Sequence, residues 1–124
     1  HAVNLNTGKI IIIGATGDRI DHSFANLLLL SSNFLKNIDI KILTEKNEIF
    51  VLRSSGSIFG EIGKIVSIFS LSPYTFFIKT KGLQYSLENE KLLFSPARGL
   101  SNVFTEEKAY IEIKEGMLLI VKEL

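Results

Sequence analysis

The stretch KIIIIGATGDRIDHSFANLLLLSSNFL, residues 9–35, sets the architecture of the chain. Its isoleucine run at 10–13 contains no polar residue, which is typical of a strand buried on both faces in an α/β domain. Gly14 and Gly17 then predict a turn, because glycine adopts backbone angles that other residues avoid. From Ile20 onward, apolar residues recur at the spacing of a helix face. This order predicts a strand, a glycine turn and a helix.

Charged residues gather where the turn meets the helix: Asp18, Arg19, Asp21 and His22. Either aspartate can cap the helix, whose positive dipole end also favours bound anions. An arginine can hold a phosphate with two hydrogen bonds, and an imidazole can titrate near neutral pH. A glycine turn of this kind is also common in α/β connections without a ligand, so on spacing alone a structural role stays the alternative.

The same residues carry a resemblance. The segment from Gly14 to Leu27 resembles the G-[AG]-x-G-[GN]-R-x-D-H-x-x-[AG]-N signature of the thiamine pyrophosphokinases. Its matching positions are Gly17, Arg19, Asp21, His22 and Asn26. Asp18 departs from the pattern, since it stands where that family usually has glycine.

The second half of the chain alternates with the period of strands. Short alternating segments separated by turn residues predict an antiparallel sandwich or barrel. Arg53–Ser57 is polar and small, and we place a boundary there, between an α/β part at 1–53 and a β-sandwich at 54–124. Two strands are predicted in the α/β part, at 39–43 and 48–52. Six are predicted in the β-sandwich, at 64–71, 74–79, 82–87, 91–95, 108–114 and 117–122.

Further segments of the second half extend the resemblance. Val66–Leu71, Lys81–Asn89 and Gly99–Asn102 resemble the family segments V-S-L-x-P-L, K-G-L-x-Y-x-L-x-N and G-[IL]-S-N, in the same order. By composition alone, Ser101 and Asn102 are an ordinary turn pair, because both side chains bond readily to nearby backbone.

Other residues of this half have structural interpretations. Tyr85 is expected to be a core aromatic residue, and Gly82 to supply a bend. We expect Arg53 and Arg98 to be solvated.

The resemblance implies an enzyme that transfers a pyrophosphoryl group from ATP to thiamine, giving thiamine diphosphate and AMP. It implies that Arg19 and Asp21 are catalytic, with Arg19 on the phosphates. Gly17, Asp18 and His22 would complete the ATP-binding set, although His22 can instead support the turn. Cationic side chains and helix amides suit the negative charge that spreads over phosphate oxygens in such a transfer.

The resemblance also implies that Ser101 and Asn102 bind thiamine, across the interface of a homodimer. Magnesium is expected with ATP, mainly through residues outside this chain, because nothing before Lys9 offers a carboxylate. We therefore expect no metal ligands here, and we expect the chain to be a fragment that does not catalyse the transfer alone. The alternative is a non-catalytic β module that binds a ligand or dimerises.

Composition narrows the remaining classes. The 124 residues carry 14 basic and 13 acidic side chains, and this balance gives no indication of a nucleic-acid or membrane-surface partner. There is no cysteine, which excludes disulfides and thiolate catalysis and fits the reducing cytoplasm. The longest apolar runs are far shorter than the roughly 20 residues of a membrane-spanning helix.

Overall fold

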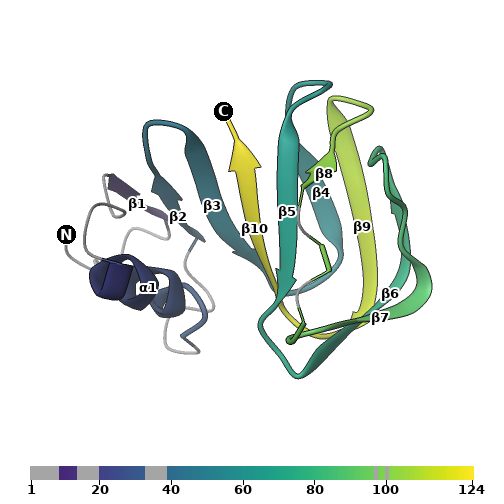
Figure 1. Cartoon of the computed structure of the whole chain (residues 1–124), viewed down its shortest axis with the longest axis horizontal. Helices are drawn as coiled ribbons and strands as arrows, with labels where there is room; N and C mark the ends of the chain where they lie inside the picture. Colours follow the sequence, from purple (N-terminus) through teal and green to yellow (C-terminus); the bar gives the residue numbers. More distant parts are fainter. Residues whose placement is uncertain (1–8, 14–19, 33–38, 97, 100) are drawn as a thin grey trace.

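The computed structural model describes residues 9–13, 20–32, 39–96, 98–99 and 101–124, which form two β-sheets and one helix. Figure 1 shows the helix beside β1 and β2, at the opposite side of the molecule from β6 and β7. Within those ranges, no helix is long and apolar enough to cross a membrane. The elements are β1 (Lys9–Ile13), α1 (Ile20–Leu29), β2 (Asp39–Leu43), β3 (Asn47–Leu52), β4 (Gly56–Phe59), β5 (Ile65–Ser70), β6 (Tyr74–Lys81), β7 (Glu88–Leu93), β8 (Asn102–Val103), β9 (Lys108–Glu115) and β10 (Leu118–Glu123).

The larger sheet has the strand order β1-β2-β3-β10-β5-β8, and the smaller sheet has the order β4-β9-β6-β7. β1 and β2 are parallel, with Ile12 opposite Ile42, whereas the other neighbouring strands of both sheets run antiparallel. A short parallel unit with a helix, followed by an antiparallel sandwich, is the fold class that the sequence predicts, and it is confirmed.

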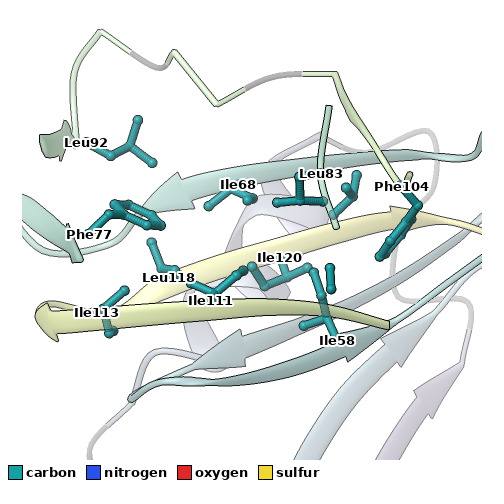
Figure 2. Close-up of a cluster of buried hydrophobic side chains, with 12 residues drawn as sticks. Ile58, Ile68, Phe77, Leu83, Leu92, Phe104, Ile111, Ile113, Leu118 and Ile120 are labelled. Atoms are coloured by element: carbon teal, nitrogen blue, oxygen red, sulfur yellow. The ribbon is translucent and has the colours of Figure 1, made fainter. Parts of the chain in front are cut away.

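The alternation of side chains along β10 shows how the larger sheet is buried on both faces. Leu118 and Ile120 point toward the smaller sheet, whereas Leu119 and Val121 join the cluster on the opposite face. Figure 2 shows the side chains of the first cluster converging between the two sheets. Its buried members are Ile58, Val66, Ile68, Phe77, Leu83, Leu92, Phe104, Ala109, Ile111, Ile113, Leu118 and Ile120.

The second cluster lies between the larger sheet and α1. Leu27 and Leu29 of the helix pack on it, and Leu30, directly after the helix, is buried in it. The helix begins at Ile20, where the apolar spacing predicts it. The buried strand and loop members of the cluster are Ile12, Leu30, Ile40, Ile42, Ile49 and Leu119.

β1 is not buried on both faces, which corrects the expectation from its isoleucine run. Ile12 is 8% exposed, but Ile11 is 45% exposed and Ile13 is 80% exposed. β1 is the edge strand of the larger sheet, and the described part of the chain covers one of its faces. The isoleucine run correctly predicts a strand, but whether the second face of that strand is buried depends on tertiary packing, which the run does not determine.

Two local features differ from what the sequence pattern indicates. Part of the polar segment where we place the domain boundary belongs to the strand Gly56–Phe59, which pairs with β9 and buries Ile58 in the core. The segment Gly82–Leu87 is not a strand. Gly82, with φ of +81°, bends the chain away from β6 as predicted, but Tyr85 is 60% exposed and is not a core residue.

The larger sheet joins strands from both predicted domains. β1, β2 and β3 come from residues 1–53, whereas β5, β8 and β10 come from residues 54–124. β3 forms hydrogen bonds with β10 along six residue pairs. The division at residue 53 therefore runs through one hydrogen-bonded sheet, and as a statement about domains it stays a prediction.

Candidate functional site

The described part of the predicted phosphate-binding set lies at the start of α1. Gly17, Asp18 and Arg19 fall outside the described residues. Asp21 and His22 lie in the first turn of the helix, and both are exposed. The backbone amide of His22 donates a hydrogen bond of 2.9 Å to Asp21 Oδ1. The carboxylate thus lies at the positive end of the helix dipole, where an acidic side chain is favoured.

A groove opens on the face of the larger sheet that carries α1. Its volume is about 440 Å³, which lies within the range of small-molecule sites. The helix forms one wall, the strands β3, β5 and β10 form the floor, and Phe94 follows from the end of β7. The lining is mostly apolar, and its residues are Phe24, Leu27, Ile49, Ser67, Phe69, Ser70, Leu71, Phe94, Leu119 and Val121.

Two serines supply the polar side chains of this lining. Ser70 Oγ is engaged below the groove, with Ser72 O at 2.9 Å and Thr75 Oγ1 at 2.8 Å. Ser67 Oγ accepts a hydrogen bond of 3.0 Å from the backbone amide of Ser101. Ser67 therefore ties the loop of the predicted thiamine-binding pair to the rim of the groove.

Ser101 and Asn102 differ in their surroundings. Ser101 is exposed and has a φ of +57°, a conformation that is uncommon for serine. Asn102 is 5% exposed, and its side chain bonds to the backbone of Tyr85 in both directions. Its Oδ1 accepts from Tyr85 N at 3.0 Å, and its Nδ2 donates to Tyr85 O at 2.9 Å. Asn102 holds this segment in place, whereas the side chain of Ser101 is exposed.

Two glycines of the family-like segments are required by close contacts. A Cβ on Gly99 would lie 2.1 Å from the carbonyl oxygen of Ile68, on the central part of β5. Gly99 O also accepts a hydrogen bond of 2.9 Å from Ile68 N. Gly82 has a φ of +81°, and a Cβ there would lie 2.9 Å from Lys108 O. Both positions hold loops that surround Ser101 and Asn102.

A smaller, more polar cavity of about 200 Å³ lies beside Asn102. Arg98 and Glu90 line it, with Arg98 Nη2 3.5 Å from Glu90 Oε1 and 2.8 Å from the carbonyl oxygen of Lys91. Arg98 is exposed, as the sequence predicts. These bonds hold the chain that leads into Gly99 and Ser101.

Arg53 departs from the prediction that it is solvated. Its side chain is part-buried, and Nη2 donates to the carbonyl oxygens of Leu30 and Ser32, at 3.0 Å each. The sequence gives no sign of these contacts, because the partners lie more than 20 positions away along the chain. The missed groove residue Ser67 did carry a signal, since it belongs to the segment that resembles V-S-L-x-P-L.

The described residues do not build a magnesium site. No group of three or more histidine or acidic side chains comes together among them.

Comparison with known proteins identifies the family. The model of the family described as thiamin pyrophosphokinase, vitamin B1 binding domain, matches residues 46–118. This region contains most of the groove floor, Ser67 and the Ser101–Asn102 pair. None of the curated protein sequences matches the chain.

Solved structures agree with that match. The thiamin pyrophosphokinase family protein from Enterococcus faecalis is 28% identical, with a TM-score of 0.79 over 92% of this chain and 55% of its own. The thiamine pyrophosphokinase from Bacillus subtilis, at 24% identity, has the same fold, with a TM-score of 0.84 over 94% of this chain and 55% of its own. The yeast enzyme, at 18% identity, shares the fold with a TM-score of 0.75 over 92% of this chain and 39% of its own. This chain thus spans about half the length of these bacterial proteins, and it belongs to the thiamin pyrophosphokinase, vitamin B1 binding domain, family.

Proposed function

We propose that the chain forms the thiamine-binding part of an enzyme that transfers a pyrophosphoryl group from ATP to thiamine. The observation that carries this proposal is the groove beside Ser101, most of whose floor belongs to the region matched by the vitamin B1 binding family. In the reaction, the hydroxyl oxygen of thiamine bonds to the β-phosphorus of ATP and loses its proton. The bond between that phosphorus and the oxygen bridging to the α-phosphate breaks, and AMP leaves.

The lining of the groove suits the chemistry of thiamine. The molecule joins an aromatic pyrimidine to a cationic thiazolium ring, and Phe24, Phe69 and Phe94 offer aromatic surface to both. A cation near an aromatic face gains about 0.5 to 2 kcal/mol, depending on how far water is excluded. The hydroxyl groups of Ser67 and Ser101 supply the polar contacts that orient a ligand in a mostly apolar site.

The phosphates of ATP would lie toward the start of α1. Asp21 and His22 are exposed there, within one helix turn of Phe24 in the groove wall. We propose that Arg19 contacts the phosphates, with Gly17, Asp18 and His22 beside it, and that Asp21 orients the reacting hydroxyl. Held in this order, the two substrates would meet near the N-terminal end of the helix, where developing negative charge is stabilised.

The proposal includes partners beyond this chain. Magnesium would arrive with ATP and neutralise its phosphates, through ligands other than the residues described. A homodimer in the cytoplasm is the assembly that the family resemblance implies, with a second copy closing the open side of the groove. The isolated chain is expected to bind thiamine weakly and to be inactive alone.

Two measurements test the proposal. Thiamine diphosphate formation from ATP, magnesium and thiamine is measured with the full-length gene product and with this chain, and thiamine binding is measured by calorimetry. We expect turnover in the full-length protein and none in the isolated chain. Ser101→Ala in the full-length protein should weaken thiamine binding about tenfold, which is the loss of roughly one hydrogen bond. Ser54→Ala, in an exposed turn, is the matched control.

The outcomes separate the candidates. Full-length protein without turnover or thiamine affinity would refute the proposal. Thiamine binding without turnover would favour the alternative, a non-catalytic module that binds the vitamin. Turnover by the isolated chain, purified free of host enzyme, would contradict the expectation that it is inactive.

A further inference from the structure

The turn after the C-terminal end of α1 is held by a residue that is distant along the chain, directly after β3. The last carbonyl groups of a helix have no partner within the helix, and they form the negative end of its dipole. α1 carries no basic residue in its last turn. The carbonyl groups of 27–29 accept hydrogen bonds from the amides of the turn that follows. The carbonyl oxygens of Leu30 and Ser32, in that turn, accept hydrogen bonds of 3.0 Å each from Arg53 Nη2.

Arg53 is placed to link three parts of the fold. It directly follows β3, where the chain crosses from the larger sheet to the smaller one. Its Nη1 lies 3.3 Å from Met117 Sδ, in the turn between β9 and β10. Met117 O in turn accepts a hydrogen bond of 2.8 Å from Leu71 N, and Leu71 lines the groove. One guanidinium therefore joins the helix end, the end of β3 and the turn that supports the groove.

We propose that Arg53 is a positioning residue that holds α1 against the larger sheet and thereby sets the width of the groove. Leu27, in the helix wall, lies three residues before the carbonyl group of Leu30 that Arg53 binds. A shift of the helix end would move this wall relative to Phe69 and Leu71, which line the groove from β5 and the residue after it. The effect on thiamine rests on the function proposed above, whereas the effect on the helix does not.

The geometry requires arginine rather than a cation of any kind. A planar guanidinium can place one nitrogen on two carbonyl oxygens while the other nitrogen contacts a sulfur atom. A lysine at this position keeps the charge and can donate to the carbonyl oxygens, but its single nitrogen cannot contact the sulfur atom at the same time. We therefore expect Arg53→Lys to keep part of the effect and Arg53→Met, which keeps much of the apolar stem, to lose it.

The test uses the full-length gene product with Arg53→Met and Arg53→Lys. Hydrogen exchange of the α1 amides should become at least tenfold faster in Arg53→Met, whereas amides of β6 and β9 should change less than twofold. The KM for thiamine should rise about tenfold. The KM for ATP should change less than threefold, because Asp21 and His22 lie at the other end of the helix. Arg53→Lys should recover part of both changes.

Arg98→Met is the matched control, because Arg98 also donates to a backbone carbonyl group but does not contact α1. It should leave exchange in α1 unchanged. Unchanged exchange in α1 of Arg53→Met, or faster exchange spread equally over all strands, would overturn the proposal. A wild-type protein that does not bind thiamine would refute the proposed function, while the exchange data would still judge the role of Arg53.

Discussion

Asn102 is predicted to contribute more to the stability of the sandwich than its place in the two-residue strand β8 indicates. Its side chain is 5% exposed and joins two segments that are 17 positions apart, because it exchanges two hydrogen bonds with the backbone of Tyr85. Its Oδ1 also accepts a hydrogen bond of 2.9 Å from Val103 N. Replacement by alanine removes all three bonds and leaves backbone groups near the core without partners.

The size of the effect follows from these contacts. A neutral hydrogen bond contributes about 0.5 to 1.5 kcal/mol, so the two bonds with Tyr85 account for about 1 to 3 kcal/mol of the free energy of unfolding. Unpaired backbone groups at the same site bring the expected loss for Asn102→Ala to about 2 to 4 kcal/mol. For a chain of this length, the melting temperature should fall by roughly 4 °C for each kcal/mol.

Urea unfolding followed by circular dichroism measures this loss. Asn102→Asp is the informative companion, since it keeps the acceptor but replaces the donor with an oxygen that faces Tyr85 O. It should be destabilised about as much as Asn102→Ala. Ser101→Ala is the control, and it should change the stability by less than about 0.5 kcal/mol because the side chain is exposed. If Asn102→Ala unfolds at the same urea concentration as the wild type, the loop is not held by these bonds.

Two further predictions concern a charged cluster and a close contact. Glu48 lies between two cations, with Lys122 Nζ at 2.8 Å and Lys41 Nζ at 2.9 Å from its carboxylate oxygens. Burial opposes the ionisation of Glu48, but the hydrogen bonds from the two lysines outweigh burial and hold the pKa of Glu48 below its ordinary value. The stabilisation is therefore present above pH 4.5 and is lost as the pH falls through the lowered pKa, so Glu48→Gln should cost about 1 to 2 kcal/mol at pH 7. The difference from wild type should shrink in urea titrations as the pH is lowered below 4.5, and a constant difference would contradict the assignment. Gly99→Ala should lower the free energy of unfolding by more than about 2 kcal/mol and weaken thiamine binding. The reason is that its Cβ would lie 2.1 Å from Ile68 O and push away the loop that carries Ser101. An unchanged melting temperature and unchanged thiamine binding by calorimetry would show that the loop tolerates the side chain.

Local patterns in the sequence predict most of the fold. The isoleucine run and the apolar spacing after Ile20 locate β1 and the start of α1, because strand and helix periods are properties of neighbouring residues. The alternation along 118–123 likewise shows which side chains of β10 share a face. The resemblance located the Ser101–Asn102 pair and named the family that the comparison confirms.

Tertiary structure decided the features that depend on distant partners. Alternation assigns Ile11 and Ile13 to one face of β1, but it cannot tell that this face lacks a neighbour in the described part of the chain. Because Arg53 is charged, the sequence predicts that it is solvated. In the folded chain, the end of α1 comes close enough for Arg53 to donate hydrogen bonds to two carbonyl groups. The groove exists because α1 covers part of a sheet whose central strand, β10, is the last element of the chain. The hydrophobic period of a helix or strand depends on residues a few positions apart, whereas these contacts depend on how whole elements pack. The sequence therefore determined the elements and their family, and the packing decided the site.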